Sequence, residues 1–130
     1  MTYDALGIAG TGLSLHRKWL DAVADNIANV NTVTSTDDAA FRARYVLATE
    51  GTEDDPGAYV AGAAFGNPEG RLTHEPDHPL ADEDGYVRYP DIDMSEQMGS
   101  LILAQRGYQA SAAVVDRAKT AYEAALQIGK

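Results

Sequence analysis

Two apolar repeats, one at each end of the chain, constrain the fold more than any other feature of the sequence. In the N-terminal repeat, seven apolar side chains and one histidine recur at alternating intervals of three and four: Leu6, Ala9, Leu13, His16, Leu20, Val23, Ile27 and Val30. This heptad spacing lines up the set on one face of an α-helix. It predicts a helix from about Tyr3 to Val30, roughly 42 Å long at about 1.5 Å per residue.

The C-terminal repeat has the same alternation over ten positions: Met94, Met98, Leu101, Gln105, Tyr108, Ala112, Val115, Lys119, Tyr122 and Leu126. Where Gln105 and Lys119 interrupt it, the neighbouring Ala104 and Ala118 widen the apolar stripe. The spacing predicts a second helix from Met94 to Gln127, roughly 51 Å long.

The sequence also indicates how these helices begin and end. Ser95 followed by Glu96 suits the start of the second helix, with Asp93 also available as its N-cap, and Gly129 is a natural stop. The first half of the N-terminal repeat contains three glycines, and each costs about 1 kcal/mol relative to Ala in a helix interior: Gly7, Gly10 and Gly12. They predict either a helix end that frays when alone or a place where another backbone approaches closely.

The middle of the chain has the pattern of short strands. Alternation from Phe41 to Leu47 predicts a half-buried strand with Phe41, Ala43, Tyr45 and Leu47 on one face, and two further strands are predicted, from Ala58 to Ala63 and from Tyr86 to Tyr89. Turn-forming residues separate these segments: Asp55-Pro56-Gly57, Asn67-Pro68 and Asp84-Gly85.

Together these elements predict a mainly α fold, with N- and C-terminal helices pairing as a coiled-coil-like hairpin and a small central β-rich region. The expected divisions are residues 1–33, 34–93 and 94–130, forming one discontinuous helical domain with a central insertion. A two-helix hairpin of this size buries too little surface to be stable alone. Oligomerisation is the simplest remedy.

The charge is concentrated in the middle of the chain. The net charge is −10, and residues 34–93 hold fourteen acidic and four basic side chains, whereas both flanking segments are nearly neutral. This partition suits a solvated outer segment joined to helices that pack against neighbours, although strand and loop regions also collect acidic residues for local reasons. The acidic balance argues against nucleic-acid binding, which needs Lys and Arg facing phosphate.

Other classes of protein are disfavoured by what the sequence lacks. The chain has no cysteine, which removes disulfides, thiol nucleophiles and cysteine-ligated metals. Its apolar runs are shorter than the roughly 18 to 20 residues needed to cross a bilayer. The opening MTYDALGIAG lacks a basic n-region and a cleavage site, so a cleaved signal peptide is not expected.

Two short motifs resemble metal sites but fail on geometry. His74-Glu75-Pro76-Asp77-His78 matches the H-E-x-x-H zinc pattern, which requires a helix, and a proline lies inside the motif. The better interpretation is a turn with two exposed histidines. Asp82-Glu83-Asp84-Gly85 resembles part of a calcium loop without its first ligand, which favours an acidic turn. The remaining histidine, His16, fits an interfacial or partly exposed position. Because none of these residues forms a convincing site, we expect no metal, no cofactor and no enzymatic activity.

Three ordered blocks of the sequence carry a resemblance to a known family. The first is Asp25-Asn26-Ile27-Ala28-Asn29-Val30-Asn31-Thr32; the second runs from Pro76-Asp77-His78-Pro79 to Tyr89-Pro90-Asp91-Ile92-Asp93; the third contains Gln105-Arg106-Gly107-Tyr108-Gln109-Ala110. In this order they resemble the flagellar axial proteins, and most closely the proximal-rod proteins. The chain departs from the family where Val33 to Asp38 follows Asn31-Thr32, and where Gly107 and Ser111 stand.

The resemblance implies a structural subunit of the flagellar basal-body rod. It also implies partners, namely other rod proteins, copies of the chain itself and the flagellar type III export apparatus, with no nucleic acid and no membrane insertion. The implied location is the rod within the cell envelope. An acidic cytosolic adaptor, whose helical hairpin binds a partner helix, is the alternative.

The predicted assembly interface lies on both terminal helices. Its members are Leu13, Leu20, Val23, Asn26, Ile27, Asn29, Asn31, Met98, Leu101, Tyr108, Gln109, Val115 and Tyr122. The three asparagines have two interpretations of equal weight: a helix end near Asn31-Thr32, or amides that hydrogen-bond across subunits and fix register. For Met98 and Tyr108, a place in the core of the chain is the favoured interpretation.

Overall fold

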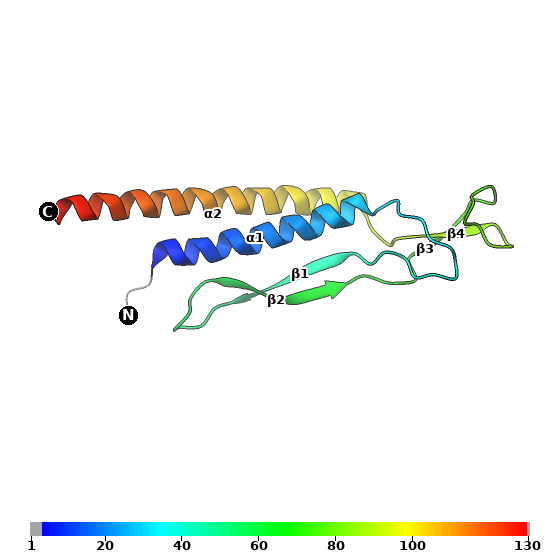
Figure 1. The fold of residues 1–130 in the computed structure, drawn as a ribbon, viewed down its shortest axis with the longest axis horizontal. Helices are drawn as coiled ribbons and strands as arrows, with labels where there is room; N and C mark the ends of the chain where they lie inside the picture. The colour runs from blue at the N-terminus through cyan, green and yellow to red at the C-terminus, as the bar shows by residue number, and fades with distance from the viewer. Residues whose placement is uncertain (1–3, 130) are drawn as a thin grey trace.

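The computed structural model describes residues 4–129, and two long helices dominate it (Figure 1). Helix α1 spans Ala5–Ala28 and helix α2 spans Met94–Ile128. The predicted start at Tyr3 lies outside the described residues, and α1 ends at its C-cap Asn29, slightly before the predicted Val30. Asp93 and Gly129 cap α2, which confirms both predicted ends. Neither helix combines the length and apolarity required to cross a membrane.

The helices and one β-hairpin form three layers (Figure 1). Helix α1 lies in the middle, with antiparallel α2 on one side and the hairpin of β1 (Arg44–Glu50) and β2 (Ala58–Phe65) on the other. Helix α1 therefore has two covered faces. Thr11, Leu15 and Trp19 lie toward the hairpin, whereas the predicted heptad face lies toward α2.

The first strand differs from its prediction in position and in orientation. It begins at Arg44, three residues after the predicted Phe41, and its half-buried residues include Val46. Val46 and Ala48 line the space against α1, whereas Tyr45 and Leu47 are 37% and 48% exposed. The prediction of the buried face holds at Phe41 and Ala43, which pack in the core before the strand begins. It is wrong at Tyr45 and Leu47, because helix α1 covers the opposite face of the strand itself. The register of β1 and β2 shifts after Leu47, which marks a β-bulge.

A second hairpin projects beyond the end of the helix pair (Figure 1). Strand β4 (Tyr86–Tyr89) was predicted, but its partner β3 (Arg71–His74) was not, since the segment RLTH is short and carries little apolar pattern. A turn with φ = +84° at Gly85 precedes β4, as the Asp84-Gly85 pair predicts.

The buried core is small and lies where the helix pair meets the strand region. Val30, Ala43 and Ile92 form one cluster, with Phe41 packed against it. Further buried apolar residues lie between the layers and under the second hairpin: Ala22, Val23, Ala40, Val87 and Ala104. The prediction of a mainly α chain, with two terminal helices packed together and small antiparallel sheets between them in sequence, is confirmed.

Candidate assembly interface

Three contacts fix the register of the helix pair. Gly12 lies against Ser111, Gly107 lies against the ring of His16, and Asn26 hydrogen-bonds Gln97 at 3.1 Å. In each pair the two residue numbers add up to 123, as expected for one uninterrupted antiparallel register. His16 is half-buried, and its Nδ1 lies 2.7 Å from the carbonyl oxygen of Gly12, so the prediction of an interfacial histidine is confirmed.

The glycines of α1 have different surroundings. A Cβ at Gly12 would lie 3.0 Å from Ser111 Oγ, so this glycine permits the close approach of α2. A Cβ at Gly10 would meet no described atom within 4 Å, and one at Gly7 would meet only Asp4 of the same helix end. Of the two alternatives, close approach of a second helix describes Gly12 and does not describe Gly10.

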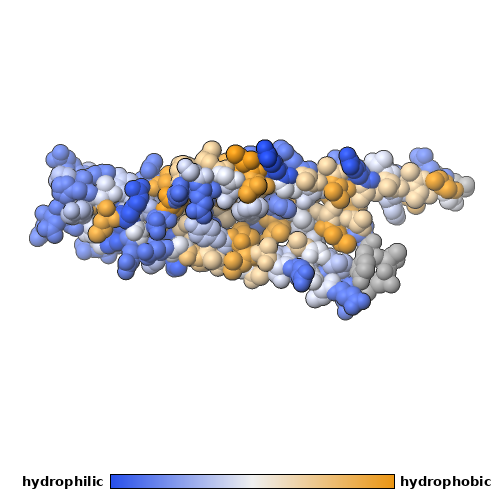
Figure 2. All heavy atoms as spheres, turned by 180° about the vertical axis from the view of Figure 1, so that it is seen from behind, coloured by the Kyte–Doolittle hydropathy of each residue, from blue (hydrophilic) through white to orange (hydrophobic). Residues whose placement is uncertain are grey.

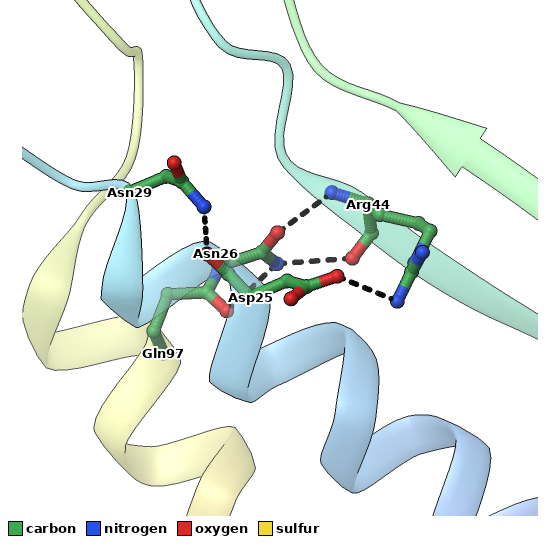
Figure 3. A network of polar contacts seen from close by, with 5 residues as sticks. All are labelled: Asp25, Asn26, Asn29, Arg44 and Gln97. Atoms are coloured by element: carbon green, nitrogen blue, oxygen red, sulfur yellow. Dashed lines mark hydrogen bonds and ion pairs between the residues drawn. The ribbon is translucent and has the colours of Figure 1, made fainter. Parts of the chain in front are cut away.

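Asn26 is fully buried and joins three elements (Figure 3). Its Nδ2 donates to the Arg44 carbonyl at 2.9 Å and to Gln97 Oε1 at 3.1 Å, while its Oδ1 accepts the Arg44 N–H at 2.8 Å. Asp25 pairs with the Arg44 guanidinium at 3.0 Å beside it. The amide of Asn26 is thus used inside the chain.

The other two predicted asparagines lie at the helix end. Asn29 Nδ2 donates to the Asp25 carbonyl at 2.8 Å, and Asn29 is the C-cap of α1 (Figure 3). Asn31 is exposed in the turn that follows. The interpretation of the asparagine run as a local helix end therefore describes Asn29, although the helix stops before Asn31.

The face of α2 that contacts α1 is displaced by about one residue from the predicted one. Gln97 and Ala104 are 1% and 0% exposed, whereas Met98 is 45% exposed. Tyr108 is also 37% exposed. The interpretation of Met98 and Tyr108 as core residues was wrong, because small side chains at Ala104 and Gly107 bring α1 onto their side of α2.

The predicted interface residues fall into three groups. Two are buried within the chain, Val23 and Asn26. Six are half-buried: Leu13, Leu20, Ile27, Asn29, Leu101 and Val115. Five are exposed: Asn31, Met98, Tyr108, Gln109 and Tyr122.

The C-terminal part of α2 extends beyond α1 (Figure 1). The common register places Ala5, the first residue of α1, level with Ala118, and residues 119–128 therefore form an overhang. Ala118 is half-buried, whereas all ten residues of the overhang are exposed. Tyr122 and Leu126 continue the face that packs against α1, yet they are 66% and 55% exposed. In this structure no described residue of α1 lies opposite them.

A second apolar stripe on α2 was missed as a set. It is formed by Leu103, Ala110, Val114, Ala121 and Ile128, all of them exposed, and we call it the outer stripe. Intervals of seven, four, seven and seven residues keep these side chains on one side of the helix, roughly a third of a turn from the face that contacts α1. Leu103, Val114 and Ile128 are 60%, 51% and 85% exposed. The spacing of these five residues was the feature of the sequence from which the outer stripe could have been predicted.

Hydrophobic and hydrophilic residues occupy different parts of the surface. Hydrophobic residues occur along the length of α2 and around the layer between α2 and the first hairpin, whereas hydrophilic residues cover the β3–β4 end (Figure 2). The acidic side chains of the central segment therefore lie largely at one end of the molecule and at the tip of the first hairpin.

The described polar residues of the second hairpin stabilise its turns and do not form a metal site. His74 lies in strand β3 rather than on a helix, so the H-E-x-x-H geometry is not formed, and His78 lies in the following turn. Asp82 Oδ1 accepts the backbone N–H groups of Asp84 at 3.0 Å and Tyr86 at 2.9 Å. Among residues 4–129, no group of three potential ligands is arranged to hold a metal ion.

The comparisons with known proteins all point to the same protein family. The chain matches the family model "Flagella basal body rod protein" over residues 6–34 and "Flagellar basal body rod FlgEFG protein C-terminal" over residues 83–128. It is 35% identical over 126 residues to the flagellar basal-body rod protein FlgC of Yersinia enterocolitica, covering 95% of this chain and 94% of that relative. The FlgC protein of Aquifex aeolicus is 32% identical over 130 residues, covering 98% and 97%.

Proposed function

This chain belongs to the FlgC family of flagellar basal-body rod proteins, and we propose that it builds the proximal rod by packing the exposed faces of α2 against neighbouring rod subunits. The family is structural and not enzymatic. The alternative of a cytosolic adaptor is not favoured. The neighbours proposed are copies of this chain and other rod proteins.

The observation that carries this proposal is the exposed outer stripe of α2. Five apolar side chains on one side of a helix create a surface that water solvates poorly, and burying each large one contributes about 1.5–3 kcal/mol. A helix with apolar stripes on two sides is suited to lie between two other helices. Coiled-coil-type packing between subunits is the arrangement that the heptad intervals favour.

The exposed members of the predicted interface belong to the same proposal. Met98, Tyr108, Gln109 and Tyr122 remain available on α2, and Asn31 remains available after α1. Asn26 and Val23 support the interface from inside the chain instead, because both are buried. The half-buried residues are proposed to contribute their free edges.

The charge partition supports a division between an inner core and an outer part. We propose that the helical segments 1–33 and 94–130 form the core of the assembly and that the acidic insertion 34–93 lies outside it, as one discontinuous domain. The nearly neutral helices can approach one another closely without strong repulsion. Export through the flagellar type III apparatus without a cleaved signal peptide, and a final place in the envelope-spanning rod, complete the proposal.

Charge substitutions on the outer stripe test this function. Leu103→Glu and Val114→Glu are expected to leave the purified chain folded, since both side chains are more than half exposed, but to prevent rod assembly. Ala39→Glu adds the same charge to an exposed loop of the acidic insertion and should leave swimming intact. The measurements are circular dichroism of purified protein, the amount exported, and the basal-body content of the cells. Complete rods in Leu103→Glu/Val114→Glu cells would refute the proposal.

A further inference from the structure

The first hairpin covers the face of α1 that α2 leaves free (Figure 1), and its described hydrogen bonds to α1 lie at its two ends. One attachment lies at its tip, near the glycine-rich first half of α1. The other lies at its base, near the last turn of that helix. The two attachments differ in chemistry.

Thr11 makes the attachment at the tip. Its hydroxyl donates to the Ile8 carbonyl within α1 at 2.6 Å and accepts the backbone N–H of Ala58 at 3.0 Å. Gly57, with φ = +147°, packs so closely on Thr11 that a Cβ there would collide with the threonine side chain. The hairpin tip is thus fitted onto this one side chain.

Asn26 makes the attachment at the base. Two hydrogen bonds from its side-chain amide hold both backbone polar groups of Arg44, the first residue of β1 (Figure 3). Asp25 adds an ion pair to the Arg44 guanidinium at 3.0 Å. These contacts are formed by the well-packed end of α1, where Ala22 and Val23 are buried.

Between the two attachments the layers are incompletely filled. A pocket of about 230 Å³, partly open to solvent, lies between α1 and β1 and is lined by Leu15, His16, Trp19, Val46 and Ala48. The side chains in the middle of the hairpin therefore hold α1 less tightly than the two ends do. Loss of the tip contact should consequently free the tip without releasing the base.

The first half of α1 is the part that needs external support. It carries Gly7, Gly10 and Gly12, which disfavour helix. Its helical form therefore depends on packing, against α2 on one face and against the hairpin on the other. We propose that the β1–β2 hairpin is a strap that keeps the glycine-rich half of α1 helical, with the Thr11 hydroxyl as its latch. When the latch opens, this half of α1 unfolds locally while the Asn26 end stays folded.

The test compares two threonines that both bond their own helix. Thr11→Val keeps the side-chain shape and removes the acceptor for Ala58, whereas Thr120→Val removes a similar bond to the Asp116 carbonyl on the overhang, where no strap lies. Amide hydrogen exchange is measured residue by residue in the purified chain. In Thr11→Val, exchange over residues 8–14 should become about threefold to tenfold faster, with Ala22 to Asn26 unchanged. Thr120→Val should leave both regions unchanged.

A second variant separates helix support from general destabilisation. Gly10→Ala adds a methyl group that meets no described atom within 4 Å and favours helix. Combined with Thr11→Val, it should return exchange over residues 8–14 toward the original rate while the Ala58 amide stays fast. If Thr11→Val speeds exchange only at Ala58, or equally throughout the chain, the hairpin is not a strap for α1.

Discussion

At the scale of single residues, Gly107 determines how closely the two helices approach at His16. A Cβ at this position would overlap the imidazole ring, so alanine forces the ring or the helix to move. We expect Gly107→Ala to lower the free energy of unfolding by about 1–3 kcal/mol, the usual cost of overpacking. Gly99→Ala is the matched control, because a Cβ at this α2 glycine meets no described atom within 4 Å. It should be neutral or stabilising by up to about 1 kcal/mol.

Urea denaturation of both variants measures these differences. The double variant His16→Ala/Gly107→Ala should lose less stability than the two single losses predict, since removing the ring makes room for the new methyl group. Additive losses, or a Gly107→Ala variant as stable as Gly99→Ala, would show that the ring and the glycine are not packed together.

Asp82 illustrates how a residue in an acidic turn acquires a structural role. Hydrogen bonds from the Tyr86 N–H first, and also from the Thr36 hydroxyl and the Asp84 N–H, lower the pKa of the Asp82 carboxyl although partial desolvation opposes them. A carboxyl whose pKa is lower in the folded state stabilises the fold above its unfolded pKa, and this contribution disappears as the pH falls through the folded pKa. The turn should therefore stay intact at mildly acidic pH.

Carbon NMR titration of the side-chain carboxyls measures this pKa directly. The Asp82 carboxyl should titrate below the ordinary aspartate value of 3.8, and Asp82→Ala should shift the amide resonances of Tyr86 and Thr36. Glu83→Gln, at the exposed neighbouring position, is the control and should leave those resonances in place. An ordinary or raised pKa for Asp82 would contradict the hydrogen-bonded turn.

At the scale of elements, the buried amide of Asn26 joins α1, α2 and the first hairpin. Asn26→Leu leaves the Arg44 N–H and carbonyl without their partner, and each buried unpaired polar group costs about 1–3 kcal/mol. Gln97→Leu removes only one bond of Asn26 and should cost less. Gln109→Leu, at an exposed α2 position, should be nearly neutral. Thermal unfolding of the three variants should give this order, and equal losses for Asn26→Leu and Gln109→Leu would contradict it.

The sequence predicts elements better than it predicts their orientation. Heptad spacing and the capping residues Asp93 and Gly129 are local properties, so both helices, the end of α1 and both ends of α2 were predicted closely. The buried face of α2 was displaced because the repeat weighs apolarity, whereas close packing selects small volume at Ala104 and Gly107. The face of β1 depends on which side α1 covers, and no local pattern contains that information.

The candidate site was predicted in a similar way. Exposed apolar residues such as Tyr108 and Tyr122 were identified from their spacing, but their availability depends on where α1 ends. A register-fixing amide was one of two interpretations of Asn26, and its partners lie 18 and 71 positions away in the sequence. The sequence alone therefore could not distinguish a bond within the chain from one between subunits.

At the scale of the whole molecule, the unequal lengths of the helices leave one end of the chain incomplete. Helix α2 has 35 residues and α1 has 24, and the described overhang of residues 119–128 carries the α1-facing stripe onward without α1 beneath it. An unsupported helical segment of ten residues is marginally stable in water. In the proposed assembly, a neighbouring subunit covers the stripe and orders the overhang.

Tyr122→Glu combined with Leu126→Glu tests this role. Both side chains are more than half exposed, so the stability of the free chain should change by less than about 0.5 kcal/mol. In the assembled rod the same two side chains would be buried, and placing charges there should cost at least the roughly 3–6 kcal/mol that burying a Tyr and a Leu contributes. That loss is a more than hundredfold weakening of each subunit contact, because 1.4 kcal/mol corresponds to a factor of ten.

The control carries two negative charges on another side of the overhang, at Thr120→Glu and Gln127→Glu, about 100° or more around the helix from Tyr122 and Leu126. Both pairs should be exported in similar amounts, because each adds two glutamates to the same segment of the chain. Only the Tyr122→Glu/Leu126→Glu cells should lack rods and fail to swim, as judged from isolated basal bodies and motility in soft agar. If these cells swim while the control cells do not, a neighbouring subunit contacts the overhang through its polar side. In that case the part of the α1-facing stripe that packs against another helix ends at Ala118.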